Sequence, residues 1–125
     1  MSAPIIWTFL FCSILILPSF AQIGSTESDK LRALFQEFRY QEVIQNAEEI
    51  LQRNSKMSKE EECEILRLLS LSYYSQQDMQ GALKNFAKII EIDPNYRLNP
   101  VENSPKILAF FEEIRHQTQE NHCMG

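Results

Sequence analysis

The sequence has few of the residues that build turns, cross-links and catalytic centres. Its 125 residues include three glycines, five prolines, three cysteines and two histidines. So little glycine and proline argues against a collagen-like chain, a linker or a loop-rich disulfide scaffold. No segment alternates apolar and polar residues with a period of two, so we expect no β-strand. The length allows one domain.

Motifs of catalysis and cofactor binding are also missing. Neither G-x-x-x-x-G-K-[ST] nor G-x-G-x-x-G occurs, so the sequence predicts no phosphate-binding loop. No histidine precedes His116, which leaves only the end of the chain for a Ser-His or Cys-His pair. His116 and Cys123 are seven residues apart, about 10 Å along a helix axis, which is too far to share one ion. We therefore expect a non-enzymatic protein without cofactor or metal.

Basic residues are fewer than acidic residues: the sequence has 12 basic and 17 acidic side chains and a formal net charge of −5. This balance argues against a nucleic-acid partner, because such binding depends on neutralising phosphates. An apolar fraction of 44% is enough for a packed core. Residues 1–21 contain no charged side chain at all.

The uncharged N-terminal segment is typical of a secretory signal peptide. Residues 5–17 form a 13-residue apolar run, whereas a membrane-spanning helix needs about 20 residues. Pro18 ends the run, and the Ser-Phe-Ala sequence that follows places small residues before a cleavage point. No lysine or arginine precedes the run. An uncleaved membrane anchor and a buried core helix are the alternatives. We predict a signal peptide over 1–21, a polar leader over 22–28, and export to a bacterial periplasm or cell envelope, or otherwise secretion.

Five amphipathic stretches separated by breakers predict an all-α domain over residues 29–116, followed by a polar, flexible tail over 117–125. In each stretch the apolar residues recur at helical spacing. The third stretch is apolar on more than one face, which indicates a helix packed on several sides. The apolar positions are Leu31, Leu34, Phe35 and Phe38; Val43, Ile44, Ala47, Ile50 and Leu51; Ile65, Leu66, Leu68, Leu69, Leu71, Tyr73 and Tyr74; Ala82, Leu83, Phe86, Ile89 and Ile90; and Ile107, Phe110, Phe111 and Ile114.

Helix starts are marked by capping residues. Ser28 or Asp29 can cap the first helix, and Asp78 can cap the fourth. Ser58 and Glu61 have the spacing of a capping box, in which the hydroxyl accepts from the third amide and the carboxylate reaches back. Ser104-Pro105 opens the fifth helix as N-cap and first helical residue.

The second and fourth stretches align with each other at an offset of 39 residues. The pattern Tyr40-x-x-Val-Ile-x-x-Ala lies over Met79-x-x-Ala-Leu-x-x-Phe. Each follows a helix that ends in a short polar turn. A helix pair repeated at such a period is typical of a solenoid.

At these positions the chain resembles the tetratricopeptide repeat family. The first unit matches at Tyr40, and the second matches better, at Ser70, Tyr73, Ala82, Phe86 and the closing Asp-Pro at Pro94. The first unit departs from the family pattern, since Phe38 stands where the turn usually has glycine. The resemblance covers residues 29–115 and implies a short, right-handed helix-pair solenoid that binds a protein partner.

The resemblance also implies where a partner would bind, because the first helix of each family unit lines the concave face. These positions are Arg32, Phe35, Gln36, Glu64, Arg67, Leu71, Tyr74 and Ser75. Arg67 and Tyr74 flank Leu71 on one helix face, a composition enriched at binding hot spots. The alternative is that Leu71 and Phe35 are ordinary core residues and Arg67 a solvated charge.

Two further features bear on assembly. Two units and a final helix are few for such an array, so the chain could also be a self-associating or N-terminally anchored helical bundle. Cys63 and Cys123 could pair in an exported chain. The alternative is a half-buried Cys63 and an unpaired thiol in the tail. We expect no nucleic acid partner, and contact with a membrane only through an uncleaved N-terminal segment.

Overall fold

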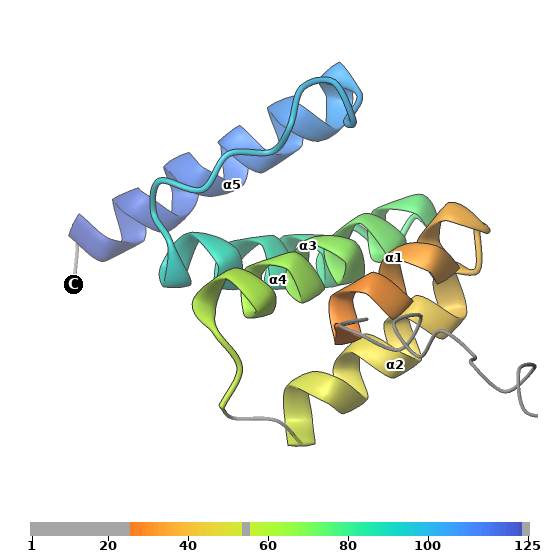
Figure 1. Cartoon of the computed structure of the whole chain (residues 1–125). Helices are drawn as coiled ribbons and strands as arrows, with labels where there is room; N and C mark the ends of the chain where they lie inside the picture. The colour runs from red at the N-terminus through yellow and green to blue at the C-terminus, as the bar shows by residue number, and fades with distance from the viewer. Residues whose placement is uncertain (1–25, 54–55, 124–125) are drawn as a thin grey trace, which may run out of the picture.

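The computed structural model describes residues 26–53 and 56–123, and its regular structure there is helical (Figure 1). Its five helices are α1 (Glu27–Gln36), α2 (Tyr40–Arg53), α3 (Lys59–Ser75), α4 (Met79–Ile92) and α5 (Pro105–Cys123). No strand occurs in these two ranges, which confirms the prediction of an all-α chain with about five helices. The predicted signal peptide lies outside the described residues, as does most of the predicted leader.

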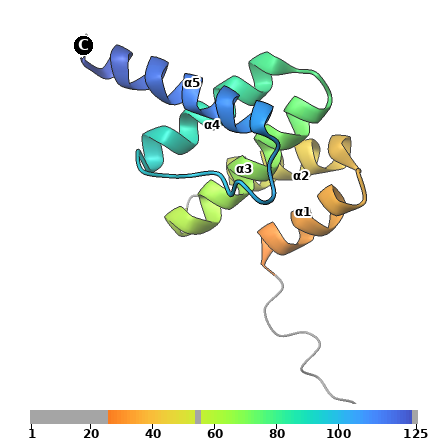
Figure 2. The same cartoon turned by 90° about the horizontal axis from the view of Figure 1, so that it is seen from above.

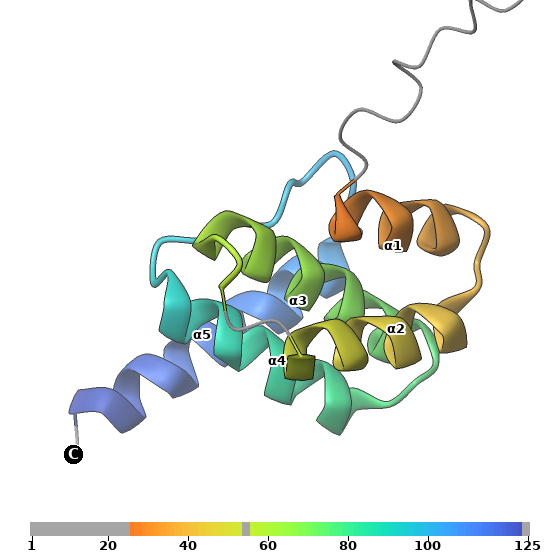
Figure 3. The ribbon, with the colours of Figure 1, turned by 60° about the horizontal axis from the view of Figure 1, so that its bottom comes forward.

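Two helix pairs, α1–α2 and α3–α4, correspond to each other at a fixed offset. The helices α2 and α4 both have 14 residues. The start of α2 and the start of α4 are 39 positions apart, and so are the ends of α1 and α3. This is the offset that the apolar pattern predicted. Figure 3 shows the four helices stacked, with α3 in contact with α1, α2 and α4.

The same backbone turn joins the helices within each pair. Phe38 follows α1 with φ of 61°, and Gln77 follows α3 with φ of 64°. The N–H of each of these residues, and of the residue after it, donates to a C=O in the last turn of the preceding helix. This is the Schellman arrangement, in which the left-handed position is usually glycine. A non-glycine residue there costs about 1 kcal/mol.

The start of α1 differs from the sequence-based prediction. The N-cap is Thr26, whose Oγ1 accepts from the Asp29 N–H at 3.2 Å while the Asp29 carboxylate accepts from the Thr26 N–H at 3.1 Å. This capping box starts the helix at Glu27, so capping by Ser28 or Asp29 was a wrong prediction, and the helical domain begins before residue 29. The sequence signal for this cap is the T-x-x-D spacing of Thr26 and Asp29.

Glu61 also differs from its predicted role. Ser58 caps α3 as expected, since its Oγ accepts from the Glu61 N–H at 3.1 Å. The Glu61 carboxylate, however, turns to α1, where it accepts from the N–H and the hydroxyl of Ser28, both at 3.0 Å. It therefore satisfies an amide that α1 cannot pair internally and places negative charge at the positive end of that helix. This contact ties the start of α1 to the start of α3.

The core consists of two apolar clusters that meet at α3. One cluster packs α3 against α1 and α2, with Ile65, Leu68 and Leu69 on its α3 side. The other packs α3 against α4, the segment after it and α5, with Leu66 and Leu71 on its α3 side. The structure thus confirms that the third helix is buried on several sides. The remaining buried apolar residues are Leu31, Val43, Ile44, Ala47, Ile50, Ala82, Phe86, Ile89, Ile90, Leu98, Phe111 and Ile114, with Cys63.

The segment between α4 and α5 runs back along α5 (Figure 1). Arg115 of α5 holds it there: the buried guanidinium donates to the C=O groups of Pro94 and Tyr96 and to Glu112 Oε2 at 3.0 Å. The same guanidinium carbon lies 5.1 Å from the centre of the Phe111 ring. One arginine therefore fixes both the path of this segment and its distance from α5.

α5 is longer than the sequence predicted. A polar tail was expected from residue 117, yet the helix continues to Cys123. Residues 117–123 contain neither glycine nor proline, so each adds a backbone hydrogen bond to a helix that is already nucleated. These last turns extend beyond the other helices (Figure 2).

Gly81 lets an aromatic ring approach the backbone of α4. A Cβ atom at this position would lie 2.7 Å from two carbons of the Tyr73 ring. The equivalent positions of the first pair hold Leu34 and Glu42. The glycine is thus required by the neighbouring tyrosine and not by the backbone turn.

We predict that Gly81→Ala lowers the free energy of unfolding by about 1–3 kcal/mol, because the added methyl overpacks the Tyr73 ring. In a Tyr73→Leu background the same substitution should raise stability, because alanine is the better helix former. Urea unfolding followed by circular dichroism measures both. A gain in stability from Gly81→Ala in the wild-type background would contradict the packing argument.

We also predict that Gln77→Gly raises the free energy of unfolding by about 1 kcal/mol, because it removes the left-handed strain. Gln76→Gly is the matched control, since Gln76 has φ of −88° and glycine brings no relief there. Thermal and urea unfolding should show a gain for Gln77→Gly alone; equal effects of the two variants would refute the assignment.

Candidate functional site

A groove lies between α1, α3 and the start of α5, with a volume of about 330 Å³. We call it the α1–α3 groove. α1 and α3 supply two walls, and residues before and at the start of α5 supply the third. Its lining residues are Arg32, Phe35, Gln36, Arg67, Leu68, Leu71, Ser75, Glu102, Asn103 and Ile107.

Six of the eight residues predicted on a concave face line this groove: Arg32, Phe35, Gln36, Arg67, Leu71 and Ser75. Glu64 lies in an adjoining polar pocket of about 460 Å³ that shares Arg32, Arg67 and Glu102 with the groove. The α1 and α3 positions are thus brought together as the sequence implied. The third wall was missed, since no local signal in 98–104 reveals that this segment returns past α3.

Tyr74 is the predicted residue that the structure places elsewhere. Its ring packs on Phe110 of α5, with the ring centres 5.5 Å apart. Leu71 is 4% exposed and belongs to the core. Arg67 and Tyr74 therefore do not flank an exposed leucine: Leu71 packs in the core, as the alternative had it, but Arg67 is a shielded partner of Glu64 and not a solvated charge. The reason is α5, whose Phe110 packs on Tyr74 near the end of α3.

A charged network occupies the junction of the groove and the polar pocket. The Glu64 carboxylate accepts from both Nε and an Nη of Arg67, at 2.8 and 2.7 Å, and from an Nη of Arg32 at 2.6 Å. Arg32 also donates to Asp29 at 3.0 Å. The side chains of Arg67 and Glu64 are 13% and 21% exposed, so the pair is largely shielded from water. The two parallel hydrogen bonds between Arg67 and Glu64 hold the orientation of both side chains in addition to pairing their charges.

The network sets the protonation of its members. Burial alone would raise the pKa of Glu64, but hydrogen bonds from Arg67 and Arg32 lower the pKa below its usual range. The hydrogen bond with Glu64 raises the pKa of Arg67 despite burial. Tyr96, which lines the adjoining pocket, has its pKa raised to about 12, chiefly by burial. All three groups therefore keep their ordinary charge at neutral pH.

Both cysteines of the described residues are free. Cys63 is 4% exposed in the core, and Cys123 is exposed at the end of α5. Burial raises the pKa of the Cys63 thiol, which makes it unreactive. The two cysteines are thus unpaired in the structure; Cys63 is more deeply buried than the alternative expected, and Cys123 ends a helix and does not lie in a tail.

Within residues 26–53 and 56–123, no group of three or more His, Cys, Asp and Glu side chains could hold a metal ion. In the same part of the chain, no helix has both the length and the apolar character needed to cross a membrane. Comparison with family models, curated proteins and solved structures finds no match to this chain. The candidate site is therefore defined by its own geometry.

We predict that Glu64→Gln lowers the free energy of unfolding by about 1–3 kcal/mol at pH 7, because it leaves the shielded Arg67 without its carboxylate. The pKa of Glu64 is lowered in the folded protein, so its contribution is present above the unfolded value of 4.5 and is lost as the pH falls through the folded value. The difference between wild type and variant should therefore shrink below pH 4.5.

Urea unfolding between pH 3 and pH 7 measures this difference. Glu120→Gln is the control, because it removes an exposed carboxylate near the end of α5. A wild-type advantage over Glu64→Gln that persists unchanged to pH 3 would show that the ion network does not stabilise the fold.

Proposed function

We propose that the chain is a non-catalytic protein-interaction module of the cell envelope, a short tetratricopeptide-like solenoid whose α1–α3 groove receives a segment of a protein partner. The observation that carries the proposal is that equivalent helices of two corresponding pairs line one groove. The groove contains Arg32, Phe35 and Gln36 from α1 and Arg67, Leu71 and Ser75 from α3.

The family positions support the proposed architecture. Ser70, Ala82 and Phe86 are fully buried, as small and aromatic residues between packed repeat helices would be. Tyr40 packs edge-on against Phe35, with ring centres 5.4 Å apart. Pro94 follows the end of α4, where the family pattern closes a unit.

The chemistry of the groove suits a peptide. Leu68 and Leu71 form an apolar floor, while the amides of Gln36 and Asn103 and the hydroxyl of Ser75 lie among its lining groups. An extended peptide can place one apolar side chain on such a floor and pair its backbone with neutral polar groups. The volume is at the lower end of the range for small-molecule sites, which favours a side chain as the occupant.

The proposal includes export, because the uncharged run over residues 5–17 has the length of a signal-peptide core. N-terminal sequencing of the protein recovered from its host tests this part. A new N-terminus at Gln22 is the expected result, and an intact Met1 would favour the anchored alternative.

We predict that Gln36→Arg together with Ser75→Arg abolishes binding of a partner recovered with the wild-type chain, because two long side chains fill the α1–α3 groove. Both positions are exposed, so the helices should form unchanged. Pull-down with the C-terminally tagged chain, read by mass spectrometry, measures binding, and circular dichroism measures helicity.

Gln45→Arg is the matched control, because Gln45 is exposed on α2 outside the groove. A partner lost only from the groove variant supports the proposal. If the groove variant keeps every partner that the wild type and the control bind, the groove assignment is wrong. Sedimentation equilibrium of the same samples would reveal a self-associated bundle instead.

A further inference from the structure

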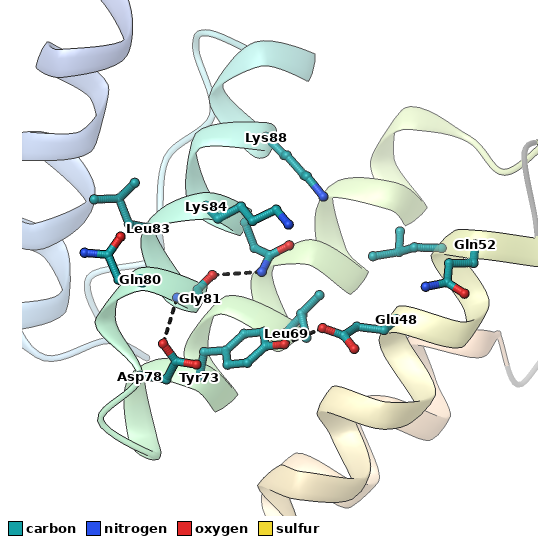
Figure 4. Close-up of a pocket in the computed structure, with 12 residues that line it drawn as sticks. Glu48, Gln52, Leu69, Tyr73, Asp78, Gln80, Gly81, Leu83, Lys84 and Lys88 are labelled. Carbon is teal, nitrogen blue, oxygen red and sulfur yellow. Dashed lines mark hydrogen bonds between the residues drawn. The ribbon is translucent and has the colours of Figure 1, made fainter.

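A second and larger groove, of about 650 Å³, lies between α2 and α4 (Figure 4). We call it the α2–α4 groove. Its floor comes from α3, at Leu69 and Tyr73. Glu48 and Gln52 reach into it from α2, and Lys84 and Lys88 reach toward them from α4.

The two grooves lie on opposite faces of α3. Leu71 lines the α1–α3 groove, and Leu69 and Tyr73 line the α2–α4 groove. Residues two positions apart are about 200° apart around a helix of 3.6 residues per turn. A ligand in one groove therefore cannot touch the α3 residues of the other.

The carboxylates that line the α2–α4 groove are already bound. Glu48 Oε1 accepts from the Tyr73 hydroxyl, and Asp78 Oδ1 accepts from the Gly81 N–H at 2.9 Å as the N-cap of α4. Burial first, and then the contact with Glu48, raises the pKa of Tyr73 to about 12, so the phenol stays protonated and keeps donating. Both carboxylates thus have neutral partners in the structure, a hydroxyl and a backbone amide, and neither forms an ion pair with a lysine of the described residues.

The two lysines, by contrast, have no partner among the described residues. All six arginines form ion pairs with carboxylates, but neither Lys84 nor Lys88 forms an ion pair or a hydrogen bond there. Every Asp and Glu of the sequence lies in the described residues, so no acidic side chain outside them could pair with the lysines. At four residues apart on one helix, the two like charges repel each other. Two unpaired positive charges thus lie side by side on α4, in a groove whose two carboxylates, Glu48 and Asp78, are hydrogen-bonded elsewhere.

We infer that the α2–α4 groove binds an acidic, extended polypeptide segment with carboxylates at alternate positions. Side chains four residues apart on a helix have Cβ atoms about 5–6 Å apart. Alternate residues of an extended chain are about 6.6 Å apart and point to the same side. Two carboxylates of the sequence form Glu-x-Glu can therefore meet Lys84 and Lys88 together, while the residue between them faces away from the lysines.

A polypeptide fits this groove better than an anionic membrane surface. Lysines that bind a lipid surface project from a protein, whereas these two lean into a groove opposite Glu48 and Gln52 (Figure 4). The amides of Gln52 and Asn85 line the same space, and such groups pair with a peptide backbone. The Asn85 NH₂ already donates to the Gly81 C=O at 2.8 Å, which leaves its amide oxygen as an acceptor.

The test is fluorescence anisotropy with a labelled peptide, acetyl-Ser-Glu-Leu-Glu-Leu-Ser-amide, and its counterpart with glutamine in place of both glutamates. The purified chain should bind the acidic peptide, more weakly as salt rises. Lys84→Gln with Lys88→Gln should weaken binding about tenfold, the loss expected for two ion pairs. Lys59→Gln with Lys106→Gln is the matched control, since both lysines are exposed outside the groove, and should change little.

Several results would overturn the inference. The wild-type chain could fail to bind the acidic peptide, or it could bind the glutamine peptide as tightly as the acidic one. The lysine variant of the groove and the control variant could also lose the same amount of affinity. Binding to phosphatidylglycerol vesicles without binding to the peptide would instead identify a membrane surface. Loss of peptide binding in Gln36→Arg with Ser75→Arg would place the peptide in the α1–α3 groove, so the outcome is separable from that of the proposed function.

Discussion

The burial of α3 is the constraint on which the rest of the structure depends. This helix carries apolar side chains around most of its circumference and cannot be stable with any large part of that surface in water. The α1–α2 pair covers one side, through Leu68 and Leu69, and α4 with α5 covers another, through Leu66 and Leu71. Only narrow strips of α3 remain between its neighbours, and both grooves lie along them. The positions of the grooves thus follow from the way in which α3 is covered.

Most predictions that depended on neighbours along one helix were confirmed, although the cap of α1 and the end of α5 differ from the prediction. The helices, the 39-residue offset and the capping roles of Asp78 and Ser58 all arise within a few residues of the chain. The other failures occurred where a residue found its partner in another element. Glu61 has the spacing of a local capping box, yet its carboxylate gains more at the start of α1. Tyr74 was placed in the groove because local pattern does not reveal that Phe110 covers it.

The candidate site shows the same division. The α1 and α3 positions of the groove could be predicted, because residues at equivalent positions of two repeated helix pairs lie on the same face of the stack. The third wall could not, since it depends on Arg115, a residue of α5 that binds the C=O groups of Pro94 and Tyr96. No pattern near Asn103 indicates that an arginine twelve residues later determines where this segment runs.

The two helix pairs also show how similar backbones acquire different surfaces. In the first pair, Leu34 and Glu42 occupy the positions that Tyr73 and Gly81 hold in the second. The absence of a Cβ at Gly81 leaves room for the tyrosine ring, whose hydroxyl then reaches Glu48 of α2. That bond joins the two pairs and occupies a carboxylate at the edge of the α2–α4 groove. The glycine and tyrosine of one unit therefore give Glu48 a hydroxyl partner, and Lys84 and Lys88 have no ion-pair partner in the part of the chain that the structure describes. In the α1–α3 groove, by contrast, both arginines are ion-paired, Arg67 with Glu64 and Arg32 with Glu64 and Asp29. The ligand proposed for that groove must therefore be selected by shape and neutral polar groups, and the ligand proposed for the α2–α4 groove by charge.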